Sequence, residues 1–401
     1  MSNLIHTSPN SKANIVVLIT HSLSEMDVLL PIFSEIKSAH NVRIEIIFAV
    51  RKIYRQYQQS AFYRYCCQKL GVKVSHYLLP NRFDPGFRFF LFSRFGSFLI
   101  KGFFLLLKPI QYARVFTTLR AASILLHEFS NQTSSTSILY RIQIKYATPI
   151  WVYDHGHAIR LAQNPGNRMI KHSDRVTLLN FHEHNHKSYS NIGFKKQKII
   201  GYSKFYPEWQ KVVRSYKQPS RVVNDHEKHV VIFSRHVHPY YMDQDVYHFL
   251  LTSAVRSIRN SLGSRRIIIK PHPREDIDLI NELIQQQDFT GIEISNEHPA
   301  VLSQQALFAI SFWGSTILDP LSFDIPAIEY YIEAEHFREL EPEGSSYRNL
   351  GIDSVDNEHD LKLFIQRVVD GTYRLPAVVS ELRQELHIDT LFELVDPNQK
   401  M

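Results

Sequence analysis

The feature that most constrains this chain is the stretch 266–276, Arg-Ile-Ile-Ile-Lys-Pro-His-Pro-Arg-Glu-Asp. A β-branched run bounded by prolines is typical of a strand buried on both faces. Pro271 and Pro273 lack an N–H and fix φ, so the sheet cannot continue through the turn. His272 is therefore held at the carboxyl end of a strand, where open α/β sheets bind ligands. The alternative is a turn histidine with a solvent partner. The turn also carries Lys270 and Arg274.

A second stretch, 306–320, has the same strand–turn–helix plan. A buried strand ends at Ser311, and Gly314 permits a tight turn. Ser315 and Thr316 stand where a helix should begin. Hydroxyls and free N–H groups at a helix N-terminus form an anion site, usually for phosphate. The alternative is an ordinary N-cap at Ser315.

The chain begins with a strand, a helix and a strand, which is the start of a doubly wound sheet. The expected strands are 14–20 and 42–48, and the helix between them runs to about 37. Ser22 or Ser24 can cap this helix. No Gly-x-Gly-x-x-Gly follows the first strand, so no dinucleotide cofactor is expected. His21 and Asp27 lie in the loop and first turn, as candidate acceptor-side groups or as ordinary capping-loop residues.

A third strand end carries polar residues. The pattern predicts further strands at 122–129, 149–153, 176–181 and 195–201, and a helix at 134–146. The strand 149–153 delivers Asp154-His155-Gly156 and, a few residues on, Arg160. The alternative is a polar strand-end turn with Gly156 at positive φ.

The second half repeats the alternation of strands and helices. Expected strands are 229–233, 266–270, 292–295, 306–311 and 324–330, and expected helices are 243–261, 276–287 and 298–305. Ser234 and Arg235 follow the first of these strands. The helix 243–261 is amphipathic, with Val246, Phe249, Leu250, Ala254 and Ile258 expected on its buried face. The predicted domains are 1–205 and 206–375, followed by a helical tail at 376–401.

In this order of motifs, the chain resembles bacterial GT-B transferases that build surface polysaccharides such as capsule and lipopolysaccharide. The pattern is most similar to that of CDP-glycerol glycerophosphotransferase-like proteins. Bacterial sialyltransferases and Kdo transferases also use a His-Pro motif followed by a Ser/Thr-rich motif. The resemblance covers about 152–331 and implies an α/β fold of two Rossmann-like doubly wound domains facing a central cleft. His155 and Gly156 match the family's His-Gly pair, whereas Asp154 stands where Trp or Gln is common.

The resemblance implies a metal-independent, inverting glycosyltransferase or polyol-phosphate transferase. A nucleotide-activated donor would bind the second domain, and a glycan or lipid-linked acceptor the first. No cofactor is expected. His155 would be the base, with His21 and Asp27 as rivals, while His272 would act on the donor phosphate. The implied donor-binding residues are Ser234, Arg235, Lys270, Arg274, Ser311, Gly314, Ser315 and Thr316; those on the acceptor side are Asp154, Gly156 and Arg160.

Two other classes remain open. A non-hydrolysing sugar-nucleotide 2-epimerase shares the two-domain plan and needs no acceptor. A non-catalytic, basic protein that binds membrane or nucleic acid would show no affinity for a donor nucleotide, and its binding would weaken steeply with salt.

Composition indicates a globular protein with an anionic partner. The 401 residues are 44% hydrophobic, and the formal net charge is +7. The only cysteines are the adjacent Cys66 and Cys67, which are not expected to bridge, and no metal-ligand spacing occurs, so a reducing, cytoplasmic compartment and no metal are expected. The N-terminus is polar and does not resemble a secretory signal.

The segment 82–120 interleaves basic residues with Phe and Leu. This pattern fits peripheral attachment to anionic lipid at the inner face of the cytoplasmic membrane. The alternative is that its aromatic residues belong to the domain core. Nucleic acid is not expected as a partner, because no RNA-binding signature accompanies the pattern. Unchanged vesicle binding after charge reversal at Arg88, Arg94 and Lys101 would refute the lipid hypothesis.

Overall fold

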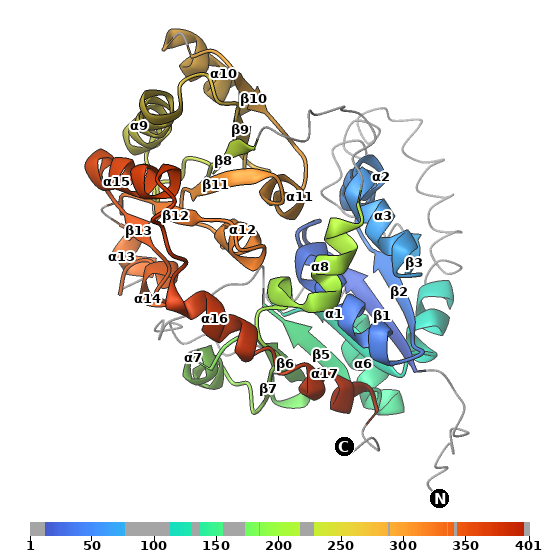
Figure 1. Cartoon of the computed structure of the whole chain (residues 1–401). Coiled ribbons are helices and arrows are strands. Elements are labelled where there is room, and N and C mark those ends of the chain that lie inside the picture. Colours follow the sequence, from blue (N-terminus) through green and yellow to red (C-terminus); the bar gives the residue numbers. More distant parts are fainter. Residues whose placement is uncertain are drawn as a thin grey trace, which may run out of the picture. The chain divides into compact units, whose positions relative to one another are not determined.

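The computed structural model describes residues 13–76, 113–129, 137–154, 173–183, 185–216, 228–287, 289–334, 336–340 and 343–396. The chain divides into two compact units (Figure 1). Among the described residues, unit 1 runs to Ser203 and resumes at His387, whereas unit 2 runs from Lys204 to Leu386.

Unit 1 is built on a parallel sheet with the strand order β3-β2-β1-β4-β5-β6-β7. The strands are β1 Asn14–Ile19, β2 Arg43–Phe48, β3 Lys73–His76, β4 Ile124–Glu128, β5 Ile150–Tyr153, β6 Thr177–Asn180 and β7 Lys196–Ile199. The order reverses between β1 and β4, so the loops after these strands lie at a topological switch point. The central strands β1 and β4 are buried on both faces, although β4 includes the polar residues His127 and Glu128.

The described helices of unit 1 are α1 Glu25–Ala39, α2 Arg51–Gln59, α3 Ala61–Lys69, a helical stretch at 113–120, α6 Ser137–Tyr146, α7 Asn185–Asn191 and α17 Ile388–Val395, with a 3-10 turn η1 at Ser173–Arg175. The expected serine cap of α1 is wrong, because Ser24 holds the N-cap position but its side chain does not cap the helix. The Glu25 carboxylate instead accepts the backbone N–H groups of residues 20, 21 and 22 at 3.2, 2.9 and 3.2 Å.

The last helix of the chain packs in unit 1. α17 contacts α1, and its Leu391 is fully buried. The ring of Phe392 meets the ring of His40 edge-on, with the centroids 5.1 Å apart. The chain therefore ends among the elements with which it begins.

The basic aromatic segment is described only in part. Residues 82–112 lie outside the described residues, and with them Arg88, Arg94 and Lys101. Residues 113–120 are helical, and Val115 and Leu119 are buried in the core of unit 1. This end of the segment is therefore core.

Unit 2 contains a second parallel sheet, with the order β10-β9-β8-β11-β12-β13. Its strands are β8 His229–Phe233, β9 Ile267–Lys270, β10 Ile292–Ile294, β11 Ala306–Ser311, β12 Ala327–Tyr330 and β13 Ser354–Val355. The order reverses between β8 and β11. Their carboxyl ends form the switch point at which sheets of this type bind ligands.

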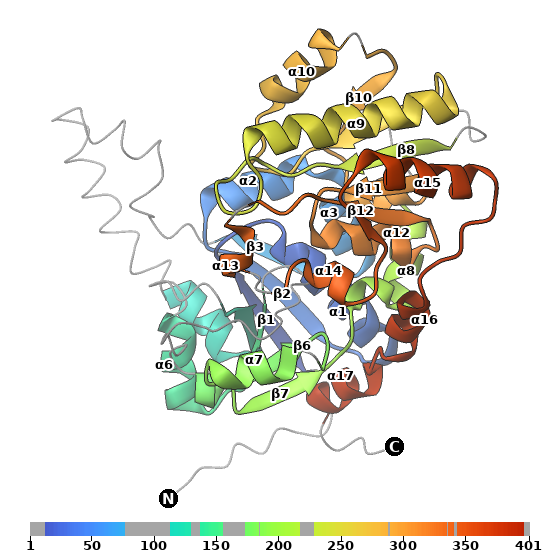
Figure 2. The same ribbon diagram turned by 90° about the vertical axis from the view of Figure 1, so that its left-hand side faces the viewer.

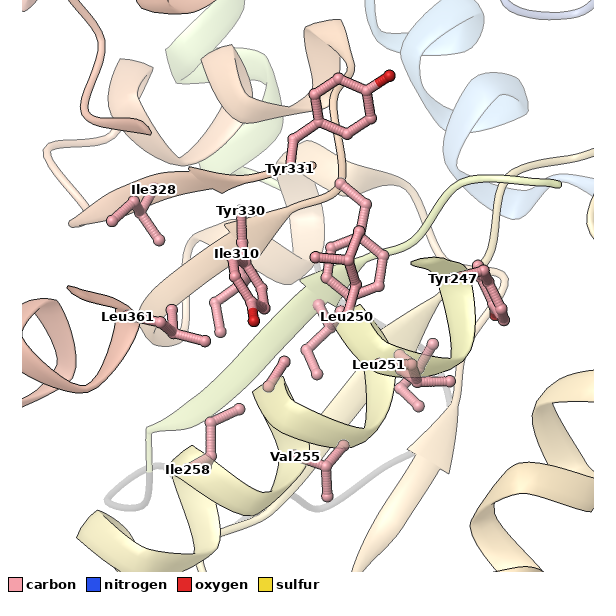
Figure 3. Packing of buried hydrophobic residues seen from close by; sticks show 14 of the residues in the cluster. Tyr247, Leu250, Leu251, Val255, Ile258, Ile310, Ile328, Tyr330, Tyr331 and Leu361 are labelled. Atoms are coloured by element: carbon pink, nitrogen blue, oxygen red, sulfur yellow. The ribbon is translucent and has the colours of Figure 1, made fainter. Parts of the chain in front are cut away.

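The helices of unit 2 are α8 Pro207–Arg214, α9 Gln244–Leu262, α10 Ile277–Gln286, α11 Pro299–Ser303, α12 Leu318–Ser322, α13 Phe337–Leu340, α14 Ser346–Asn349, α15 Glu358–Val369 and α16 Ala377–Gln384, with 3-10 turns η2 at Ser203–Phe205 and η3 at Ser315–Ile317. Long α9 runs along the sheet with α15 beside it (Figure 2). Its buried face meets strand residues such as Ile310 and Tyr330 and the α15 residue Leu361 (Figure 3).

The prediction that Phe249 of α9 lies in the core is wrong. The buried face carries Tyr247, Leu250, Leu251, Ala254, Val255 and Ile258. Phe249 is 45% exposed. Successive helical residues are rotated by about 100°, so Phe249 points away from the sheet that its neighbour Leu250 contacts.

No helix in the described part of the chain combines the length and the apolar character needed to cross a bilayer. Cys66 and Cys67, both on α3, are free and buried, so the expectation that they do not bridge is confirmed. Burial raises the pKa of the Cys67 thiol to about 12, which keeps it protonated and unreactive.

Candidate functional site

The candidate site lies in unit 2 at the carboxyl ends of three neighbouring strands. Residues 234–236 follow β8, residues 271–275 follow β9, and residues 312–316 follow β11. Two contacts bring these loops together. The His236 and His272 rings stack at a centroid distance of 4.5 Å, and Arg235 Nη1 donates a hydrogen bond of 3.1 Å to the Trp313 carbonyl oxygen.

His272 is held as a neutral hydrogen-bond donor. Burial, reinforced by the nearby cations Arg235, Arg274 and Lys270 and by His236, lowers the pKa of His272 to about 3. Its Nδ1 accepts the Arg274 backbone N–H at 3.2 Å, so the ring proton must be on Nε2. At neutral pH, His272 can therefore donate from Nε2 to an anion, but it cannot supply a positive charge.

Arg235 lies against two neighbouring aromatic rings, Tyr241 and Trp313, whose centroids are 5.4 Å apart. Its guanidinium carbon is 4.5 Å from the Tyr241 ring centroid and 4.3 Å from that of Trp313. Such contacts hold a cation in place through the negative face of the ring. Burial lowers the pKa of Arg235, but a guanidinium remains charged in proteins. The contacts with this pair of rings hold a permanent positive charge at the switch point.

Three buried polar atoms at this place have no hydrogen-bond partner within the described residues: Arg235 Nε, His236 Nδ1 and Trp313 Nε1. Buried polar atoms are nearly always hydrogen-bonded, so a group of unsatisfied ones needs an explanation. A ligand that reaches this site is one such explanation.

Trp313 has a strained backbone, which the sequence did not reveal. Its φ is +57°, in the left-handed region that L-residues seldom adopt. Its ring stacks on Tyr331 at 5.7 Å and meets Phe337 edge-on at 4.9 Å. Strained residues of this kind persist when the surrounding packing fixes them and occur often at functional sites.

The prediction that Gly314 makes the tight turn after β11 is wrong. Its φ of 177° is extended backbone that any residue adopts, and an added Cβ would make only ordinary contacts. The tight turn after β11 is made by Trp313, the residue before it.

The alternative of an ordinary N-cap at Ser315 is not found, since Gly314 holds that position and no side chain caps the turn. Ser315 and Thr316 instead lie within the 3-10 turn η3, half-buried. Buried Ser311 ends β11.

A buried ion pair anchors the turn η3. Lys204 Nζ lies 2.5 Å from Asp319 Oδ2 and donates a 3.0 Å hydrogen bond to the Ser315 carbonyl oxygen. The two side chains are 6% and 2% exposed. Lys204 therefore links the start of unit 2 to the loop after β11.

The predicted phosphate-side residues differ in their availability. Arg274 is exposed, and Lys270 Nζ donates to the neighbouring Pro271 carbonyl oxygen at 3.0 Å. The Ser234 hydroxyl donates to Glu275 at 2.8 Å, so it already has an internal acceptor.

The described acceptor-side residues predicted from the sequence are His21 after β1, Asp27 in the first turn of α1, and Asp154 after β5. His21 is exposed, while Asp27 accepts a 2.5 Å hydrogen bond from the Tyr63 hydroxyl. Asp154 is 1% exposed and accepts a 2.8 Å hydrogen bond from the Tyr189 hydroxyl. His155, Gly156 and Arg160 lie outside the described residues.

A buried carboxylate at the switch point of unit 1 was not singled out in the sequence. Glu25 accepts the Tyr153 hydroxyl at 3.0 Å in addition to the three backbone N–H groups of the β1–α1 loop. Burial, and then the charge of Glu128, raises the pKa of Glu25 to about 7. Glu25 fixes the loop that carries His21. Across the described ranges, no group of three His, Cys, Asp or Glu side chains is placed to hold a metal ion.

No protein-family model and no curated protein matches the sequence. Solved structures match over nearly the whole length. A UDP-N-acetylglucosamine 2-epimerase has a TM-score of 0.59 at 9% identity and covers 96% of this chain and 95% of its own. The fold is GT-B-like. The S. aureus protein MnaA, solved with UDP, has a TM-score of 0.54 at 12% identity, with 96% and 95% covered. The glycosyltransferase of kitacinnamycin has a TM-score of 0.50 at 13% identity, with 96% and 98% covered.

Within this GT-B-like chain, the structure brings together most of the predicted donor-side residues. Arg235, Lys270 and Arg274 lie close enough to His272 for their charges to lower its pKa. Sequence reasoning assigned no role to Trp313 or Glu275, and it named His236 only as part of the loop after β8. The sequence shows that Glu275 comes soon after the Lys-Pro-His-Pro turn, but it does not show which groups donate hydrogen bonds to its carboxylate.

Proposed function

We propose that this chain is a nucleotide-sugar-dependent transferase of GT-B type. It would move a sugar or a polyol phosphate from a nucleotide-activated donor to a surface glycan or a lipid-linked acceptor. The observation that carries the proposal is the pairing of a neutral Nε2–H donor on His272 with the fixed charge of Arg235 at the switch point of unit 2. The resemblance to CDP-glycerol glycerophosphotransferase-like proteins supports the same donor class.

The chemistry follows from the charge that develops on the leaving phosphate. Donors that already point at that position stabilise the transition state without a cost of reorganisation. Arg235 supplies charge, and His272 supplies a directed hydrogen bond. Lys270 and Arg274 add to the positive potential, which favours polyanionic ligands.

A base must also take a proton from the acceptor hydroxyl. We assign this role to His155, because an imidazole titrates near neutral pH. Exposed His21 is the first rival. Asp27 is the weaker rival, because its carboxylate already accepts the Tyr63 hydroxyl.

A 2-epimerase is the second candidate, favoured by the fold likeness to a UDP-N-acetylglucosamine 2-epimerase. The two candidates share a donor site but differ in the need for an acceptor. An epimerase converts a free UDP-sugar alone, whereas a transferase consumes its donor in step with glycosylation of an acceptor.

The deciding experiment has two stages. A thermal-shift panel of CMP, CDP, UDP and GDP should give a rise in melting temperature with at least one nucleotide, because a ligand that binds only the native state stabilises it by mass action. The matching nucleotide sugars are then incubated with and without acceptor extract. Donor consumption that needs the extract supports the transferase, and acceptor-free isomerisation of a UDP-sugar supports the epimerase. No shift and no turnover with any nucleotide would refute both.

Replacing His155 with alanine should abolish transfer and leave the nucleotide-induced thermal shift unchanged, because the proposed donor site is in unit 2. The assay pairs turnover with calorimetry of the nucleotide, and His359→Ala, an exposed position on α15, serves as the control. Retained activity would transfer the base role to His21 or Asp27. Loss of nucleotide binding would instead assign His155 to the donor site.

A further inference from the structure

Glu275 connects three separate elements of unit 2 through one carboxylate. Its Oε2 accepts the Ser234 hydroxyl at the end of β8 and the backbone N–H of His272, each at 2.8 Å. Its Oε1 accepts the Tyr247 hydroxyl of α9 at 2.5 Å. The three donors, on Ser234, His272 and Tyr247, lie 41, 3 and 28 positions from Glu275 in the sequence. A single side chain thus ties the Lys-Pro-His-Pro turn to its neighbours.

The backbone donors of the turn are all satisfied internally. Pro271 and Pro273 have no N–H. The N–H of His272 goes to the Glu275 carboxylate, that of Arg274 to His272 Nδ1, and that of Glu275 to the His272 carbonyl oxygen. An anion at this turn must therefore be bound by side chains, above all by His272 Nε2–H.

The direction of His272 then depends on Glu275. The carboxylate fixes the His272 backbone N–H, and the same turn brings the Arg274 N–H to Nδ1, which fixes the tautomer. We propose that Glu275 is a positioning residue that aims His272 at a phosphate group of the ligand. This inference rests on the proposed function, because it assumes that the ligand is a phosphate ester.

If only its charge mattered, Glu275 would weaken the binding of an anion. A carboxylate beside an anion site repels the anion, so its removal should strengthen binding. Burial raises the pKa of Glu275, but a neutral acid would add no attraction for phosphate either. Weaker binding after removal of Glu275 can therefore come only from lost positioning or from general loss of structure.

The test is a double-mutant cycle on the full chain, read by calorimetry with inorganic pyrophosphate and with UDP. Glu275→Ala should weaken pyrophosphate binding about tenfold or more, the scale of a lost hydrogen bond to a charged group. Glu275→Gln keeps the shape and an acceptor oxygen, so it should recover most of the affinity. Glu282→Ala, an exposed position on the neighbouring α10, should change nothing. In a His272→Ala background, Glu275→Ala should have almost no further effect, because coupled residues are not additive.

Two outcomes would overturn the proposal. One is unchanged or tighter pyrophosphate binding by Glu275→Ala. The other is full additivity with His272→Ala. If Glu275→Ala does not fold, Tyr247→Phe replaces it in the cycle and should weaken binding by a smaller factor through the same coupling. Because pyrophosphate binding is measured without any transfer reaction, it tests the positioning role independently of the proposed function. A coupled cycle without turnover of any nucleotide sugar would retain the positioning role and refute the transferase. Turnover of a nucleotide sugar together with an additive cycle would support the transferase and refute the positioning role.

Discussion

Replacing His272 with alanine should lower kcat/KM for the nucleotide donor by about 100- to 1,000-fold, the usual effect of removing one directed donor from developing charge. The loss should fall mainly on kcat, because the bond to Nε2–H strengthens as charge builds on the leaving phosphate. Since the pKa of His272 is about 3, the ring stays neutral between about pH 5 and 8, and the size of the loss should not vary over that range.

Two companion variants make this result interpretable. His272→Gln carries an amide N–H close to the position of Nε2 and should recover part of the activity. His359→Ala, on exposed α15, should behave as wild type. Activity of His272→Ala within about threefold of wild type with every donor would mean that the Lys-Pro-His-Pro turn is structural only.

Replacing Lys204 with methionine should destabilise the protein by about 3–5 kcal/mol, because loss of one partner from a buried ion pair leaves a buried charge without its counter-charge. The pair with Asp319 is short and almost fully buried, and the same ammonium group binds the Ser315 carbonyl oxygen. Urea denaturation monitored by tryptophan fluorescence measures the change. Lys211→Met is the matched control, since its pair with Glu208 is exposed and should contribute less than about 1 kcal/mol.

The double variant Lys204→Met with Asp319→Leu separates charge from packing. It should recover much of the lost stability, because it removes both buried charges together. A Lys204→Met protein as stable as the Lys211→Met control would show that this pair contributes little to the fold.

Most of the strands were predictable because they are apolar runs, whereas the short strands β3 and β13 were not predicted. The expected 229–233 and 306–311 are the observed β8 and β11, and those of unit 1 differ only by a residue or two at most of their ends. Burial on both faces leaves such sequences no other stable arrangement. The helix α2 was missed because only Ile53 and Tyr57 of its nine residues are buried, so its apolar stripe is very narrow.

The site was predictable only as a set of loop positions. The Lys-Pro-His-Pro turn predicted where His272 would lie, because prolines act locally. The aromatic contacts of Arg235 depend on Trp313, 78 positions further along the chain. The residues next to Trp313 in the sequence do not predict its positive φ. Its ring packs against Tyr331 and Phe337, which lie further along the chain. Sequence patterns carry short-range preferences, whereas these contacts exist only after the sheet has formed.

The return of α17 to unit 1 has a consequence for the order of synthesis. Domains generally fold as units, and the N-terminal one usually folds first during translation. Here all of 204–386 leaves the ribosome before the helix that packs on α1 exists. Unit 2 is therefore complete in sequence while unit 1 still lacks a buried part of its packing. Unit 1, whose strands are synthesised before unit 2, receives its last helix only after unit 2. A chain that stops at Leu386 therefore lacks part of the packing of unit 1, although the residues next to the cut belong to unit 2.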